Sequence, residues 1–122
     1  MAPSASPLRP LLVDGRHVAD AEVAETWSAR ARGLLGRRRL PQALLLRPEN
    51  SVHAIGMRIT LDIALLDADG RAVAVTVLPP WRATRPRRGV QAVLEAPSGA
   101  FARWGLVEGS VVTVTPAVDR PS

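Results

Sequence analysis

The chain has 122 residues, 47% of them hydrophobic, and its formal net charge is +5. This length supports one hydrophobic core and therefore a single domain. No apolar run approaches the roughly 20 residues that a bilayer requires, so we expect no membrane span. Cysteine is absent, which excludes disulfides, thiolate catalysis and cysteine-ligated zinc. The N-terminal residues contain no apolar stretch long enough for a secretory signal, and we expect a cytoplasmic protein.

The basic residues, 16 in number, are all arginines. These arginines give the chain a high pI, which is a feature of nucleic-acid-binding proteins. However, arginine without lysine, together with abundant Ala, Pro, Val and Gly, is also typical of a GC-rich coding sequence. Composition alone therefore accounts for much of the positive charge, and any nucleic-acid binding is expected to be non-specific.

The N-terminal part of the chain contains a tail, a short hairpin and one helix. Residues 1–10 are rich in Pro and Ser and are expected to be disordered. Strands at 11–13 and 16–18 flank an Asp-Gly pair, which favours a tight turn. Apolar residues at helical spacing predict a helix over 26–36. A buried strand is expected at 43–46, where the sequence is ALLL.

The helix over 26–36 has suitable ends. Thr26 can act as its N-cap and Gly36 as its C-terminal glycine. Arg37, Arg38 and Arg39 follow immediately. Basic side chains after a helix C-terminus are favoured by the helix dipole, so this cluster has a structural explanation as well as a possible role in anion binding.

The C-terminal part reads as strands joined by turns. The predicted strands lie at 61–67, 71–78, 90–96 and 111–115. Ala68-Asp69-Gly70 turns the first pair into a hairpin, and Val73, Val75 and Val77 are expected to share one face of its second strand. Ser98 is expected to cap a short helix that carries Phe101 and Trp104 and ends at Gly105.

These elements predict a mainly β fold, a small rolled barrel or sandwich with two short helices. The folded domain is expected to span residues 11–116. A loose tail at 117–122 follows it.

Four motifs occur in the order typical of one protein family. They are ETWSARARGLLGR at 25–37, GMR at 56–58, LDIALLDADGRAV at 61–73 and VLEAPSGAFARWGLVEGSVV at 93–112. Together they resemble domain of unknown function 192, a bacterial and archaeal family, over residues 21–115. The resemblance implies a small β-rich domain and no defined activity.

Asp62 is the most unusual residue, because it places a charge inside the apolar run LDIALL. Burying an unpaired carboxylate costs several kcal/mol, so a partner is required nearby. We expect Asp62 to be at least partly buried and held by Arg58 or by backbone N–H groups of the loop before it. If the small side chains of Ala72 and Ala74 lie beside it, another segment can approach closely and partly bury the carboxylate. A catalytic or ligand-binding role is the alternative.

The residues before and after Asp62 provide a candidate ligand site. Its members are His53, Met57, Arg58, Asp62 and Glu95. His53 could act as a general base or a ligand contact, or could be an ordinary loop histidine. The sequence contains no nucleophile motif, phosphate-binding glycine loop or paired histidines, so no catalytic residue, cofactor or metal is predicted.

A second arginine cluster lies in PPWRATRPRRG. Its candidate anion-binding residues are Trp81, Arg82, Arg85, Arg87 and Arg88. The prolines and the glycine predict an ordered, irregular loop in which Trp81 could stack on a ring. A solvated loop without a ligand is the alternative.

Three functions remain open. The favoured one is a non-catalytic module, expected to be monomeric, that binds an unknown small ligand or protein through the 53–62 and 81–88 loops. The second is a hydrolase-like enzyme built on His53, Asp62 and Glu95. The third is weak, non-specific nucleic-acid binding through the arginine loops.

Overall fold

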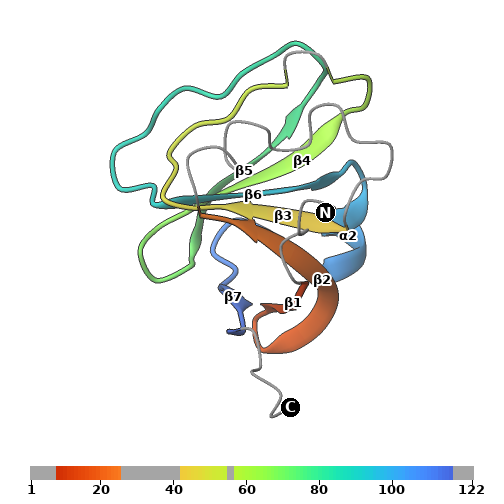
Figure 1. Cartoon of the computed structure of the whole chain (residues 1–122), viewed down its shortest axis with the longest axis vertical. Coiled ribbons are helices and arrows are strands. Elements are labelled where there is room, and N and C mark those ends of the chain that lie inside the picture. The colour runs from red at the N-terminus through yellow and green to blue at the C-terminus, as the bar shows by residue number, and fades with distance from the viewer. Residues whose placement is uncertain (1–7, 26–41, 55–56, 117–122) are drawn as a thin grey trace, which may run out of the picture.

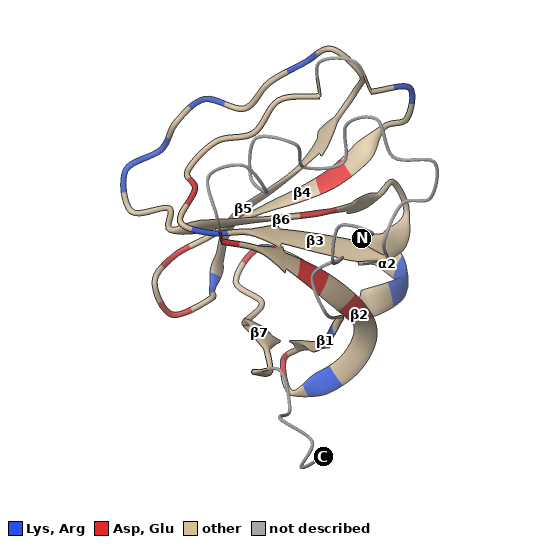
Figure 2. Ribbon diagram, viewed as in Figure 1, with Lys and Arg blue, Asp and Glu red and all other residues tan. Residues whose placement is uncertain are grey.

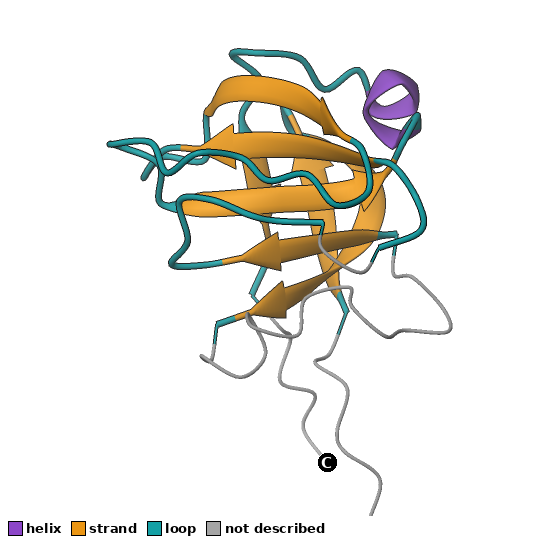
Figure 3. Ribbon diagram, turned by 90° about the horizontal axis from the view of Figure 1, so that it is seen from above, coloured by secondary structure: helices purple, strands orange, loops and turns teal. Residues whose placement is uncertain are grey.

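The computed structural model describes residues 8–25, 42–54 and 57–116. Seven strands form one mixed sheet in the order β5-β4-β6-β3-β2-β1-β7, which curls into a half-barrel (Figures 1 and 3). The mainly β prediction is confirmed. The strands are β1 Arg9–Val13, β2 Arg16–Ala24, β3 Ala43–Leu46, β4 Leu61–Leu66, β5 Ala72–Leu78, β6 Ala92–Pro97 and β7 Val112–Val114.

The described part of the chain contains one helix, α2 at Ala100–Trp104. No helix in this part is long and apolar enough to cross a membrane. The predicted helix over 26–36, the cluster Arg37–Arg39 and the tail at 117–122 lie outside the described residues.

The first hairpin is longer than predicted. It begins at Arg9 rather than Leu11, and β2 continues to Ala24 rather than Val18. The extension of β2 pairs in parallel with β3, with Ala21 opposite Ala43. Sequence patterns report a local hairpin, whereas this parallel pairing joins distant segments and leaves no local signal.

The central strands β3, β4 and β6 are buried on both faces of the sheet, which explains why β4 reads as an almost continuous apolar run. Leu61, Ile63 and Leu65 pack into one hydrophobic cluster, and Ala64 and Leu66 pack into the other. The predicted alternation of β4 is therefore confirmed.

The predicted alternation of β5 is wrong in its first half. The pairing with β4 shifts between Leu65 and Leu66, so that Val73 is an extra residue in β5. Val73 and Ala74 both pack against one cluster, while Ala72 and Val75 belong to the other. A β-bulge of this kind changes which face each following residue occupies.

The two edge strands of the sheet meet at one end. The amide of Val112 donates to the carbonyl of Gly70 at 2.8 Å, and the amide of Ala72 donates to the carbonyl of Ser110 at 2.8 Å. Arg71 and Val111 form an isolated antiparallel bridge between these bonds. The barrel is thus closed beside the β4–β5 turn and open farther along β5.

Helix α2 lies against the sheet through Phe101 and Trp104, whose ring centroids are 5.7 Å apart. The helix ends at Gly105 in the left-handed conformation, with φ 67°, as predicted. Its N-cap is Gly99 and not Ser98, and no side chain of its own turn caps it. The side chain that caps the first amides of this helix belongs to strand β4.

Candidate functional site

Asp62 caps helix α2 from a neighbouring strand. Its Oδ2 atom accepts hydrogen bonds from the amides of Gly99 and Phe101, each at 3.0 Å. The residue is only 7% exposed. Burial and a backbone partner are as expected, but the partner lies in the turn after β6, and Arg58 is exposed. The expectation that Arg58 or the preceding loop holds this carboxylate is therefore wrong.

The sheet order explains this choice of partner. Strand β4 lies between β5 and β6, and Asp62 is opposite Val77 on one side and Ala96 on the other. Ala72 and Ala74, whose small side chains could have allowed a close approach to Asp62, are paired with Leu66 and Leu65 instead. Because β6 runs directly into the turn before α2, the carboxylate beside Ala96 reaches the first amides of that helix.

Glu95 lies on the opposite face of the sheet from Asp62. It is in register with Ile63 and Leu44, and it is 3% exposed. His53 is exposed and forms an isolated bridge with Ala83. The three residues of the hydrolase-like arrangement are therefore not assembled into one site.

Met57 and Arg58 also occupy different environments. Met57 is 9% exposed and packs in the cluster that contains Leu61 and Ile63. Arg58 points to solvent as an exposed residue. Within residues 8–25, 42–54 and 57–116, no group of three His, Asp or Glu side chains could hold a metal ion.

The two loops singled out in the sequence pair with each other. The amide of Ala54 donates to Arg82 at 2.7 Å, and the amide of Trp81 donates to Ala54 at 2.8 Å. The amide of Thr84 donates to Val52 at 2.8 Å, while the Thr84 hydroxyl oxygen accepts from the Val52 amide at 2.9 Å. These bonds hold the arginine loop in a defined position beside the sheet, with Trp81 67% exposed.

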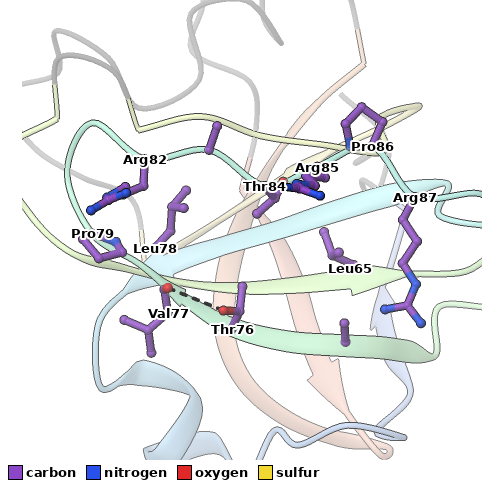
Figure 4. A pocket seen from close by; sticks show the side chains of 12 residues that line it. Leu65, Thr76, Val77, Leu78, Pro79, Arg82, Thr84, Arg85, Pro86 and Arg87 are labelled. Carbon is purple, nitrogen blue, oxygen red and sulfur yellow. Dashed lines mark hydrogen bonds between the residues drawn. The ribbon is translucent and has the colours of Figure 1, made fainter.

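An open groove of about 670 Å³ lies between the arginine loop and strand β5 (Figure 4). Arg82 lies toward one end of it, near Pro79, and Arg87 lies toward the other end. Among the described residues, no carboxylate lines the groove. Its lining is formed by Leu65, Ala74, Thr76, Val77, Leu78, Pro79, Arg82, Ala83, Thr84, Arg85, Pro86 and Arg87.

Sequence reasoning identified the arginines of this groove but missed the residues contributed by β5. Thr76 and Val77 are two consecutive residues of this strand, and both are exposed in the structure, which the sequence alone does not indicate. Consecutive exposed positions are unusual in a strand that has one buried face. Arg88 belongs to the same loop but does not line the groove.

The groove arginines differ from arginines that serve the fold. Arg71 donates to the carbonyl of Gly109 at 2.9 Å, and Arg16 donates to that of Trp104 at 3.2 Å. Among the residues described, the side chains of Arg82, Arg85 and Arg87 make no ion pair or hydrogen bond. Figure 2 shows basic residues spaced along this loop.

The chain has relatives in the archaea. The DUF192 family, described as "Uncharacterized ACR", matches residues 10–114. UPF0127 protein TK1120 of Thermococcus kodakarensis is 28% identical over 105 residues, which cover 81% of this chain and 67% of that protein. UPF0127 protein PF1050 of Pyrococcus furiosus is 31% identical over 87 residues, covering 66% of this chain and 73% of that protein.

Two bacterial crystal structures have a similar fold. A protein of unknown function from Novosphingobium aromaticivorans has a TM-score of 0.74 and 29% identity, with 93% of each chain covered. A candidate transcription regulator from Sinorhizobium meliloti has a TM-score of 0.79 and 21% identity, with 93% of this chain and 98% of that chain covered. At the latter identity the likeness concerns the fold alone. The motifs, the family match and the relatives agree, and the chain belongs to the DUF192 (UPF0127) family.

Proposed function

We propose that this protein is a non-catalytic binding module that holds an anionic partner in the groove between β5 and the arginine loop. One observation carries the proposal. Arg82, Arg85 and Arg87 line an open groove in which the described residues place no carboxylate, and within the same residues their side chains have no partner.

The chemistry of the groove fits a partner that is both acidic and partly apolar. Each guanidinium can bind a carboxylate or phosphate with two parallel hydrogen bonds. Leu65, Leu78 and Pro79 supply apolar surface between the charges. The volume of about 670 Å³ falls in the range of ordinary binding pockets.

The arrangement favours binding over catalysis. A general base must lie within hydrogen-bond reach of the group it serves. Asp62 is engaged with the amides of Gly99 and Phe101, and Glu95 is buried on the other face of the sheet. Neither residue lines the groove.

The proposal predicts a charge effect that depends on position. A fluorescein-labelled polyglutamate should bind at physiological salt, and Arg87→Glu should weaken its binding by at least about tenfold. Arg88→Glu is the matched control from the same loop, and it should change binding less than about threefold. Fluorescence anisotropy measures both. Absence of binding, or an equal effect of a single reversal at Arg88 and at Arg87, would contradict the proposal.

Nucleic acid is a second polyanion to consider, because Trp81 is exposed next to Arg82 and could stack on a base. We expect its binding to be weak, independent of sequence and lost at moderate salt. Anisotropy with short single- and double-stranded DNA and RNA measures this. Sub-micromolar affinity at physiological salt, reduced by changing Arg85, Arg87 and Arg88, would place nucleic acid ahead of an acidic protein partner.

A further inference from the structure

We infer that the partner is an extended acidic peptide segment that pairs as an added strand with the free edge of β5. This inference rests on the proposed function and specifies its ligand. Three independent features support it: the backbone of β5, the composition of its edge and the charge of the groove beside it.

Beyond its first residue, the outer edge of β5 has no backbone partner among the described residues. Strand β5 is the terminal strand of the sheet, and its neighbour in the described sheet is β4. Ala72 bonds outward, to Ser110 and Gly109, where the barrel closes. The carbonyl of Leu66 accepts from the amide of Gln91 on the β6 side, so alternation along β4 turns Leu65 and Ile63 toward β5, opposite Ala74 and Thr76. The N–H and C=O groups of Val75 and Val77 therefore point away from the sheet.

These outward groups have almost no partner within the protein. Among the described residues, no backbone hydrogen bond joins the outer edge of Val73–Leu78 to another segment. The one contact is local: the hydroxyl of Thr76 lies 3.5 Å from the carbonyl oxygen of Val77 (Figure 4), at the outer limit of a hydrogen bond.

The edge also lacks the residues that usually prevent strand pairing. Its sequence, AVAVTVL, contains no charged residue and no proline. Val77 is 56% exposed in this edge strand. Exposed edges of β-branched residues are templates for another strand, and proteins normally protect them with charges or proline. The bulge lies at the start of β5 and leaves Ala74–Leu78 regular.

The groove supplies the chemical selectivity. In an added strand every second side chain points to the same face. On the groove side these side chains would meet Arg82, Arg85 and Arg87, so acidic residues at alternate positions would be matched to the guanidinium groups. This mode combines main-chain hydrogen bonds for affinity with side-chain contacts for specificity.

Charge complementarity favours such a peptide over a second copy of this chain. A second copy paired through β5 would bring the same uncharged edge, whose sequence AVAVTVL offers no carboxylate to the three groove arginines. An acidic segment neutralises them. The expected state of the free protein therefore remains a monomer.

The test uses an acetylated, amidated peptide in which Val and Glu alternate. It should bind more tightly than the polyglutamate, because it favours a strand. Two N-methylated forms, each blocking alternate amides, separate strand pairing from charge attraction. Only every second amide of an added strand faces the receptor, so one form should lose at least about tenfold in affinity and the other less than about threefold.

A variant of the protein tests the same contact from the other side. Val77→Pro removes an outward N–H without removing a bond to β4, and it should weaken the Val-Glu peptide at least about tenfold while leaving polyglutamate binding within about threefold. Val77→Ala keeps the amide and should bind the peptide within about threefold of the wild type. Thermal melts of both variants establish that they are folded.

The outcomes distinguish the two proposals. If neither polyglutamate nor the peptide binds, the proposed function itself fails. If both bind, but the two N-methylated peptides bind equally well, the groove binds anions and the strand pairing is wrong. A dimer in sedimentation velocity that Val77→Pro dissociates would show that a second copy occupies the edge, and would overturn the inference.

Discussion

Replacing Gly70 with alanine is expected to destabilise the protein by about 3 kcal/mol, through backbone strain and a steric overlap that has no easy relief. Gly70 has a φ of +82°, a region that L-residues with a side chain seldom occupy. A Cβ atom there would also lie against the carbonyl oxygen of Val112, well inside van der Waals contact. That oxygen belongs to the backbone of β7, so relief requires the strand to move.

Gly15 is a matched control, because it has the same φ of +82° and nothing lies within 4 Å of the position that a Cβ atom would occupy. Gly15→Ala should therefore report backbone strain alone, about 1 kcal/mol. Urea denaturation of both variants measures the difference. Equal losses of stability at the two positions would mean that β7 moves aside from the β4–β5 turn at little cost, and that closure of the barrel is loose.

The bonds that close the barrel beside the β4–β5 turn also determine how much of the β5 edge stays free next to the groove. The contacts of Gly70 and Ala72 with the segment before and within β7 bind only the first residues of β5. The remainder of the strand diverges from β7, which leaves its outer edge open. A fully closed barrel would have no free edge and no place for an added strand.

The sequence was sufficient for the local elements of this fold but not for the pairing between them. The Asp14-Gly15 turn, the ALLL strand and the Gly105 helix end each depend on neighbouring residues, and each was predictable. The parallel pairing of β2 with β3 joins residues separated by a long stretch of chain. The bulge at Val73 likewise depends on how β5 fits β4, and the residue itself gives no sign of it.

In the candidate site too, the local features were predictable from the sequence, and those that depend on strand pairing were not. The arginine loop was recognisable because charged residues cluster between prolines, and its order comes from pairing with residues 52–54. Its groove could not be predicted, since the opposite wall is the face of β5. For Asp62, a charge in an apolar strand indicated burial and a partner. The identity of that partner was set by the sheet order, which places the turn after β6 beside β4.

Replacing Asp62 with alanine is expected to cost about 3 kcal/mol, because it leaves two amides at the start of α2 without an acceptor. The amide of Phe101 is buried, so water cannot fully replace the lost carboxylate. Because α2 packs Phe101 and Trp104 into the core, loosening of its first turn should also disturb that cluster. Urea denaturation followed by circular dichroism gives the free energy of unfolding.

Two controls separate this non-local cap from simpler explanations. Asp62→Asn keeps one carbonyl oxygen where a single carboxylate oxygen accepts both bonds, so it should cost less, about 1 kcal/mol. Ser98→Ala removes the residue that the sequence predicted as the cap, and it should cost less than about 0.5 kcal/mol, because its turn supplies no side-chain cap. If Ser98→Ala were instead as costly as Asp62→Ala, the helix would be capped locally. The buried carboxylate of Asp62 would then need a different explanation, because an uncompensated charge in this core would itself destabilise the fold.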